Sequence, residues 1–339
     1  MIEELMKKII FVLLLLMPVL SMAENETQLM KYSGSVIEEP HWFKESFLDI
    51  ADDVDEAQEE GKQLIIYFHQ AGCPYCYNLV QQSFLDPQLS AFIQEKFEVV
   101  SLNLWGDREV TLPSGESISE KALAVKWKVQ FTPTLLFYRD AHEPVLRIDG
   151  YRSKAVFAKV LDYVLSGDQT QSLAQSMIQT QPTETLYPSL SFDALETLEQ
   201  TDPAKPVAVL FEYPGCADCE QLHKKVLSRR DTHQLLSEFS AVRVDLSSDD
   251  LIQIDGNAKI TAQQWADQLG LTYFPSAVLL DKNKQEQFRI DGYVQAFHFQ
   301  TALEYVSGKI YKRLPEFQRY INERADRLRE SGKNVEITQ

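Results

Sequence analysis

Two pairs of cysteines are the residues of this 339-residue chain best suited to chemistry. Cys73 and Cys76 stand in "GCPYC", Cys216 and Cys219 stand in "GCADC", and the chain has no other cysteine. Each pair follows an apolar run and opens a predicted helix, where unsatisfied N–H groups and the helix dipole stabilise a thiolate. Such positions lower a thiol pKa from ~8.5 to ~3.5–7.5. The spacing therefore predicts Cys73 and Cys216 as attacking thiolates, and Cys76 and Cys219 as resolving thiols.

The sequence surrounding the two pairs occurs twice, which indicates a tandem duplication. Three segments match their counterparts: 63–76 with 206–219, 129–140 with 271–282, and "RIDGY" at 147–151 with 289–293. Apolar β-rich runs alternate with helical patterns in each copy. We therefore predict an α/β chain with two domains, each a central mixed sheet flanked by helices, plus a C-terminal helix.

The finer pattern predicts individual elements within each copy. Polar helices are expected at 47–61 and at 191–200, and hairpins at 110–118 and 252–260, around Ser-Gly and Asp-Gly turns. Thr261 and Gln264 have the spacing of a helix capping box.

The sequence also predicts the boundaries of the domains. They are a leader at 1–23, domains at 24–165 and 189–310, a linker at 166–188 with a short helix in 172–178, and a C-terminal helix and tail at 311–339. In that last segment, apolar residues with helical spacing predict a face that docks on the same chain: Leu314, Phe317, Ile321, Ala325 and Leu328.

The N-terminus has the features of a secretory signal peptide. Lys7 and Lys8 precede an apolar stretch from Ile9 to Leu20, and an A-x-A-like site ends at Ala23. Twelve apolar residues are too few to cross a bilayer of ~30 Å at ~1.5 Å per residue, so no stable membrane anchor is expected. The net charge of -17 argues against nucleic acid as a partner. These features predict an exported protein in the periplasm of a Gram-negative bacterium.

Each copy resembles the thioredoxin superfamily in the order of its elements. A strand leads to a C-x-x-C pair that opens a helix, and a later "TP" or "FP" stands before another strand. The resemblance implies cis bonds before Pro133 and Pro275, and backbone pairing of Thr132 and Phe274 with a bound substrate. It also implies protein thiols and disulfides as partners, and no cofactor beyond the redox-active disulfides.

A second, more specific resemblance rests on four segments: residues 41–76, "FTPTLLFYRD", "RIDGY" and "FQRYINERADRLRESG". These segments are similar to exported thioredoxin-like proteins associated with bacterial sulfur oxidation, which usually carry one such domain. That likeness implies a reductase, fed by a membrane electron donor, that keeps the cysteine of a carrier protein reduced.

Four residues are expected to tune the sites: Pro74, Tyr75, His69 and Asp218. The Asp218 charge beside Cys219 should raise thiol pKa values and favour the disulfide, making the second pair the more reducing one. His69 lies four residues before Cys73 and either tunes its thiolate or is a surface residue at a strand end. The buried aspartate of ordinary thioredoxins is replaced by Tyr67 and Leu210.

Other readings of the cysteines remain open from the sequence. A structural disulfide is disfavoured because so small a loop restricts the unfolded chain little. Zinc could use Cys216, Cys219 and His223, which are fewer ligands than the four of a closed structural site. A disulfide oxidase or isomerase, or a second domain that only binds partners, also fits the pattern. The four tryptophans fall in apolar patterns and are expected in the cores.

Overall fold

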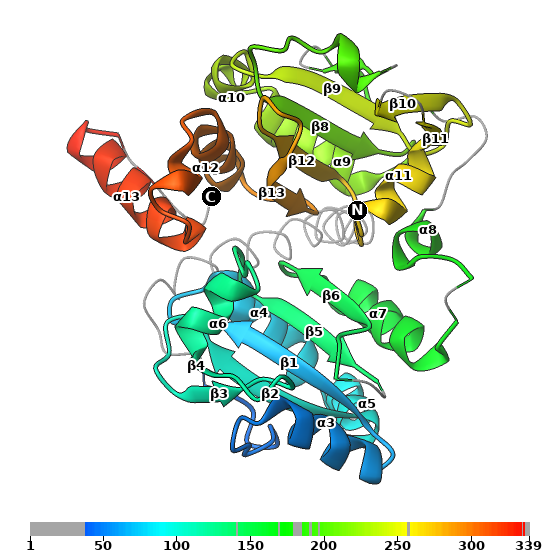
Figure 1. Ribbon diagram of the computed structural model, residues 1–339, viewed down its shortest axis with the longest axis vertical. Helices are drawn as coiled ribbons and strands as arrows, with labels where there is room; N and C mark the ends of the chain where they lie inside the picture. The colour runs from blue at the N-terminus through cyan, green and yellow to red at the C-terminus, as the bar shows by residue number, and fades with distance from the viewer. Residues whose placement is uncertain are drawn as a thin grey trace, which may run out of the picture.

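The structure is a computed structural model with two sheet-and-helix domains, one above the other in Figure 1. The predicted leader at 1–23 lies outside the described residues, so its prediction stays untested. The described residues are 38–139, 142–168, 170–178, 185–189, 192–195, 197–255, 258–333 and 335. Within them, no helix is both long and apolar enough to cross a membrane.

The first domain is built around the buried strand β1, which ends four residues before Cys73. Its sheet has the order β2-β1-β5-β6, with β1 parallel to β2 and antiparallel to β5. The strands are β1 (Gln63–His69), β2 (Phe97–Asn103), β3 (Glu109–Thr111), β4 (Ser117–Ser119), β5 (Thr134–Tyr138) and β6 (Leu146–Asp149). The helices are α3 (Ile50–Glu59), α4 (Pro74–Leu79), the π-helix η1 (Val80–Phe84), α5 (Pro87–Lys96), α6 (Glu120–Lys126) and α7 (Lys154–Ser166).

Alternating side chains of β1 enter two separate cores, because successive residues of a strand point to opposite faces. Ile65 and Tyr67 pack with residues of α4, η1, α5 and α7. Ile66 and Phe68 pack on the other face with residues of α3 and α6. The two cores hold the end of β1, and thus the "GCPYC" turn, in a fixed position.

The second domain repeats this plan around β8. Its sheet has the order β13-β12-β8-β9-β7, and the capping box of Thr261 and Gln264 is confirmed. The strands are β7 (Asp193–Ala194), β8 (Val207–Glu212), β9 (Ser240–Asp245), β10 (Leu251–Asp255), β11 (Ala258–Thr261), β12 (Ser276–Leu280) and β13 (Glu286–Asp291). The helices are η2 (Leu198–Gln200), α9 (Ala217–Leu222), the π-helix η3 (His223–Leu227), α10 (Arg230–Leu236), α11 (Ala262–Gln268) and α12 (Ala296–Ser307). Both predicted hairpins, β3–β4 and β10–β11, are present.

The predicted helix at 191–200 is wrong. Its first part is the short strand β7, which pairs with β9, and its last part is the 3-10 turn η2. The Thr197 hydroxyl accepts the Glu199 N–H, and Pro203 follows closely, so little chain is left for a regular helix. Pairing with the exposed sheet edge outweighs the helical pattern of the sequence.

The segment between the domains contains the predicted short helix, α8 (Leu173–Met177). Leu173 and Met177 belong to the core of the first domain, whereas Ala174 belongs to a core of the second. The Gln175 side-chain amide also donates to Asp267 at the end of α11. The linker therefore contacts both domains.

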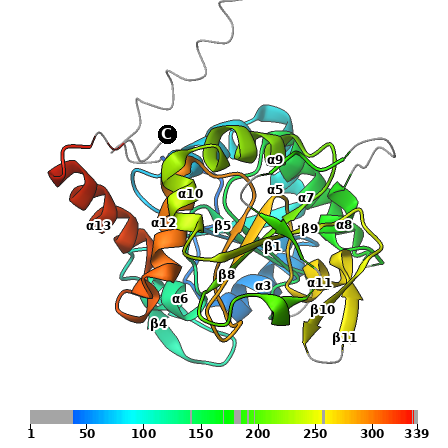
Figure 2. The same ribbon diagram turned by 90° about the horizontal axis from the view of Figure 1, so that it is seen from above.

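The C-terminal segment forms η4 (Ile310–Lys312) and α13 (Phe317–Glu330). In both views α13 lies beside α12 (Figures 1 and 2). Phe317, Ile321 and Ala325 are buried in the core of the second domain, which confirms docking on the same chain. Two ion pairs join α13 to Glu304 of α12, from Arg324 and Arg327.

Phe317 also meets a residue of the first domain. Its ring centroid lies 5.5 Å from that of Phe131, 4.3 Å from that of Phe288 and 5.2 Å from that of Tyr305. One aromatic cluster therefore joins the loop before Pro133, the edge strand β13 and α13.

Replacing Phe317 by alanine should destabilise the protein. The side chain is 1% exposed, and Phe→Ala in a packed core lowers the free energy of unfolding by ~3–5 kcal/mol. The control is Phe47→Ala, because Phe47 is fully exposed and such a change alters stability by ~0.5 kcal/mol or less. Urea unfolding followed by circular dichroism measures both. Equal midpoints for the two variants would contradict the docking of α13.

Candidate active sites

The first cysteine pair lies at the N-terminus of α4. Cys73 is the N-cap residue, and its Sγ accepts the backbone N–H of Cys76 at 3.0 Å. Pro74 occupies the first helical turn, where its missing N–H costs no hydrogen bond. The two cysteines form a disulfide, with Cys73 5% exposed and Cys76 fully buried. This geometry points Sγ of Cys73 at the helix amides that would stabilise a thiolate.

The second pair has the same arrangement at α9. Cys216 caps the helix, and its Sγ accepts the Cys219 N–H at 3.1 Å. The pair is again a disulfide, with Cys216 6% and Cys219 2% exposed. Asp218 and Glu220 lie in the first turn, so this helix terminus carries acidic groups that α4 lacks.

The two proline loops have the geometry that the family resemblance implies. The bonds Thr132–Pro133 and Phe274–Pro275 are both cis. The Thr132 hydroxyl donates to Sγ of Cys73 at 3.3 Å, and the Thr132 carbonyl oxygen lies 3.4 Å from the same sulfur. The loop and the disulfide of the first domain are therefore in direct contact, while substrate binding by these four loop residues stays a prediction.

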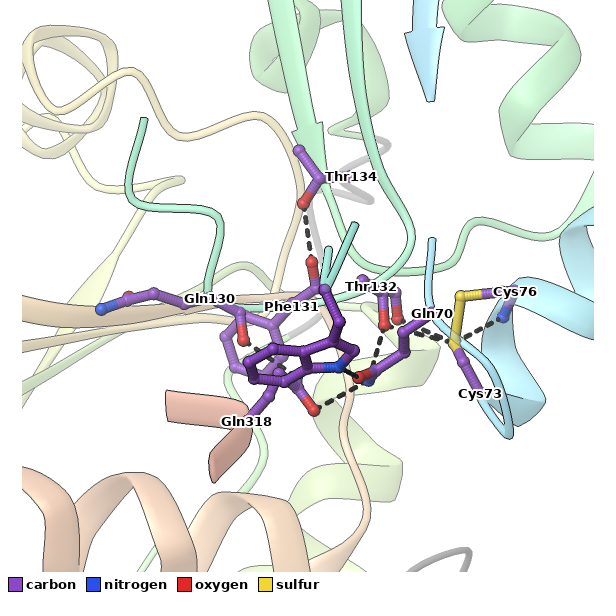
Figure 3. The surroundings of a disulfide bond; sticks show 9 residues. Gln70, Cys73, Cys76, Gln130, Phe131, Thr132, Thr134 and Gln318 are labelled. Atoms are coloured by element: carbon purple, nitrogen blue, oxygen red, sulfur yellow. Dashed lines mark hydrogen bonds between the residues drawn. A yellow bond between two sulfur atoms is a disulfide. The ribbon is translucent and has the colours of Figure 1, made fainter. Parts of the chain in front are cut away.

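A glutamine of the C-terminal helix closes the first site. The Gln318 side chain reaches from α13 to the loop before Pro133 (Figure 3). Its amide donates to the Gln130 carbonyl at 2.9 Å, and its oxygen accepts from Gln70 at 2.9 Å. Gln70 also donates to the Thr132 hydroxyl at 3.0 Å. A side-chain amide thus pairs with the backbone two residues before Thr132, the residue whose backbone the family resemblance assigns to a peptide substrate.

The motif residue Tyr75 is covered by the second domain. Its ring lies edge-on to His298 of α12, with centroids 6.1 Å apart. Burial raises the pKa of Tyr75 to about 12, and the nearby Tyr293 adds to this. Burial also lowers the pKa of His298 to about 4, so this imidazole is neutral at pH 7. The first site therefore faces the second domain through uncharged aromatic groups.

Arg152 of the first domain reaches the second site. Its guanidinium carbon lies 4.6 Å from the ring centroid of Tyr273, the residue before Phe274. The Tyr273 hydroxyl donates to the Asp218 carboxylate at 3.1 Å. Arg152 is 4% exposed, and this burial lowers the pKa of its guanidinium. Nearby groups act in the opposite direction and raise that pKa: Asp291, Tyr273 and two further carboxylates that include Asp218. A cation from the first domain is thus part of the surroundings of "GCADC".

His69 lies at the end of β1, and its Nε2 is 2.9 Å from Glu39. The hydrogen bond to His69 is the main reason why the pKa of Glu39 is lowered. The His69 ring stacks on Tyr67, with centroids 5.4 Å apart. It is partly buried and lies against a carboxylate, which differs from a bare surface residue at a strand end.

In the second domain, the position of His69 is held by Glu212. This carboxylate is buried and lies 2.7 Å from Nε2 of His223, the residue considered as a zinc ligand. The two cysteines of that hypothesis are joined in the disulfide. Among the described residues no group of three or more His, Cys, Asp or Glu side chains is gathered as a metal site would need. His223 is thus placed as the partner of a buried carboxylate.

Sequence reasoning missed the residues that close the sites. Gln318, Arg152 and His298 contact them from the C-terminal helix or the other domain. Gln70 and Tyr273 contact them from the same domain and pair with these residues. Trp105 was expected in the core but lies at its edge, where its indole N–H donates to Gln70. The repeated "RIDGY" was the one available signal, since Arg152 directly follows its first copy and Tyr293 is the last residue of its second copy.

Comparison with protein families assigns the fold. A thioredoxin-like domain matches residues 50–165 and again 193–307, which together make up more than half of the chain. The chain belongs to the thioredoxin-like family. Thioredoxin-like domains with two C-x-x-C pairs support thiol–disulfide chemistry. A search of curated proteins finds no similar sequence.

Solved structures similar to this chain include other thioredoxin folds. A thioredoxin-fold protein from Helicobacter pylori is 20% identical, with a TM-score of 0.37, over 40% of this chain and 92% of that one. A thioredoxin from Thermus thermophilus is 30% identical, with a TM-score of 0.27, over 34% and 84% of the two chains. The oxidised C-terminal domain of DsbD from Neisseria meningitidis is 19% identical, with a TM-score of 0.25, over 31% and 82%.

Removing the Gln318 amide should open the first site. In a chain that carries Cys216→Ser and Cys219→Ser, Gln318→Ala should speed reduction of the remaining disulfide by dithiothreitol about fivefold, because a hydrogen bond contributes ~1 kcal/mol. The matched control is Gln94→Ala, which changes an exposed glutamine bonded only within its own helix. An unchanged or slower reduction in Gln318→Ala would show that this contact does not close the site.

The buried Asp291 should give stability a pH dependence. Burial raises its pKa to about 6, so the folded state holds this proton more tightly than the unfolded state does. The stabilisation is present below pH ~4 and is lost as the pH rises to ~6, by roughly 3 kcal/mol at ~1.36 kcal/mol per pKa unit. Urea unfolding at pH 4 and pH 7 should show a smaller loss in Asp291→Asn than in the parent.

Asp107→Asn, which changes an exposed carboxylate, controls for the loss of one negative charge. If the free energy of unfolding falls by the same amount between pH 4 and pH 7 in Asp291→Asn and in the parent, the Asp291 carboxyl does not titrate in this range.

Proposed function

We propose that this protein is a thiol–disulfide oxidoreductase that acts on partner proteins, mainly as a reductase. The observation that carries the proposal is the contact of Cys73 with both a helix N-terminus and the loop of Pro133. The second domain repeats the cysteine at a helix N-terminus and the cis-proline loop. A thiolate at such a place is stabilised, and a backbone edge beside it can hold a peptide.

The reaction divides into two exchange steps. The Cys73 thiolate attacks one sulfur of a substrate disulfide, forming a mixed disulfide and releasing the other substrate sulfur as a thiolate, which takes up a proton. Cys76 then loses its proton, attacks Sγ of Cys73 and releases the second substrate thiolate. The substrate gains two electrons, and the enzyme ends with the Cys73–Cys76 disulfide. Cys216 and Cys219 carry out the same steps in the second domain.

The direction, the compartment and the partner belong to the proposal as well. The leader features at 1–23 favour export to the periplasm, where a reductase needs an electron donor such as a membrane protein. A sulfur-oxidation carrier protein as partner rests on the sequence likeness alone. In the folded chain both attacking cysteines are at most 6% exposed, so a protein substrate requires the two domains to move apart.

Variants that keep one cysteine pair test the proposal. Reduction of insulin disulfides by dithiothreitol should be accelerated by the chain with Cys216→Ser and Cys219→Ser, and by the chain with Cys73→Ser and Cys76→Ser. A variant lacking all four cysteines gives the uncatalysed rate. Adding Cys73→Ser to the first variant should reduce its activity to that rate, because the attacking thiolate is lost. Cys76→Ser should instead trap the mixed disulfide, visible by mass spectrometry.

Two results would contradict the proposal in different ways. Uncatalysed rates for both single-pair variants would exclude reduction of protein disulfides by either site. Activity in the first variant only would assign the second domain a partner-binding role.

A further inference from the structure

Each domain covers the site of the other. Gln318 and Phe317 of the C-terminal segment, which packs on the second domain, contact the loop before Pro133. Arg152 of the first domain lies on Tyr273, in the loop before Pro275. The loops that the family resemblance assigns to substrate are therefore both occupied, and the occupant is the other half of the same chain.

The turns at the end of the repeated "RIDGY" form the centre of this contact. Gly292 has a φ of +100°, and a Cβ there would lie 3.2 Å from Tyr273 and 3.4 Å from Arg152. A Cβ on Gly150, at φ +87°, would lie 3.9 Å from the Asp291 backbone oxygen. The positive φ favours glycine at both positions, and the 3.9 Å distance is an ordinary van der Waals contact between the two turns. The repeated motif thus brings equivalent turns of the two domains together.

Contacts across the same interface reach the middle residues of both motifs. Tyr75 of "GCPYC" lies edge-on to His298, with ring centroids 6.1 Å apart. Asp218 of "GCADC" accepts from the Tyr273 hydroxyl at 3.1 Å, and the Arg152 guanidinium of the first domain lies over the Tyr273 ring. Both C-x-x-C motifs therefore border the contact between the two domains.

We propose that the two cysteine pairs exchange a disulfide with each other within one chain. This inference rests on the thiol–disulfide activity proposed above and names the partner of each site: the other domain. The Asp218 charge disfavours a thiolate and so favours the disulfide at the second pair, which gives the direction of electron flow from the second pair to the first.

The exchange balances without any other reactant. In a chain with a reduced second pair and an oxidised first pair, the Cys216 thiolate attacks Sγ of Cys73. The Cys73–Cys76 bond breaks, and Cys76 leaves as a thiolate that takes up a proton. Cys219 then loses its proton and attacks Sγ of Cys216, which releases Cys73 as a thiolate. The second pair has lost two electrons, and the first pair has gained them.

The full chain with Cys76→Ser and Cys219→Ser tests this exchange, because only the two attacking cysteines remain. Mild oxidation with diamide should give a monomer with a Cys73–Cys216 disulfide, identified as one cross-linked peptide after proteolysis. Its rate should not depend on protein concentration. It should exceed by ~100-fold or more the rate between two chains with one cysteine each at micromolar concentration, since linked sites have millimolar effective concentrations.

The matched control is Cys73→Ser with Cys216→Ser, which leaves the two resolving cysteines. Both are buried, at 0% and 2% exposure, and should not form a monomeric disulfide. A monomeric Cys76–Cys219 disulfide formed at the same rate in this control would show unspecific pairing and overturn the exchange.

No cross-link, or cross-linked dimers only, in the variant with Cys73 and Cys216 would also overturn the exchange, because a disulfide needs Cα atoms within ~7 Å. The insulin assay separates the two proposals. If the single-pair variants reduce insulin while no monomeric cross-link forms, the exchange fails and the oxidoreductase function stands. If neither reduces insulin, the function itself fails.

Discussion

The requirement on which the structure depends is that a reactive sulfur lies at a helix N-terminus, directly under a proline loop. In the first domain, Sγ of Cys73 lies 3.0 Å from the backbone nitrogen of Cys76 and 3.3 Å from the hydroxyl oxygen of Thr132. Two cores hold β1 from both sides and fix this meeting point. In the second domain Cys216 likewise caps α9, and the Phe274–Pro275 bond is cis, so duplication gives two cysteine pairs at equivalent helix termini.

Duplication also gives each centre a neighbour. An exposed thiolate beside an open loop would react with many disulfides, whereas here Gln318 bonds the backbone before Thr132 and Arg152 lies over the Tyr273 ring. Gln318 is a neutral amide that can pair like a peptide. Arg152 instead brings a buried cation towards Asp218, with Tyr273 between them. The two covers are chemically different, which distinguishes the two centres in charge as well as in sequence.

Local pattern was enough to predict the helix that follows each cysteine pair and the Thr261 cap, because each depends on residues close in sequence. The apolar face of α13 was also evident from its helical spacing, although the residues on which it packs are distant in sequence. It failed at 191–200, where pairing of β7 with β9 decides the structure. It also could not predict the contact between Gln70 and Gln318, which lie 248 positions apart. That contact depends on how two domains meet, and a repeat pattern carries little information about this beyond the repeated "RIDGY".

In the proposed exchange the two cysteine pairs are unequal, and electrons pass from "GCADC" to "GCPYC". The most direct measurement is the reduction potential of each pair in the intact chain. The protein would be equilibrated in glutathione buffers, alkylated, and analysed by peptide mass spectrometry. The exchange predicts that the Cys216–Cys219 pair has the lower potential, by ~30 mV or more, which corresponds to a tenfold equilibrium constant. Equal potentials, or a lower potential for Cys73–Cys76, would contradict it.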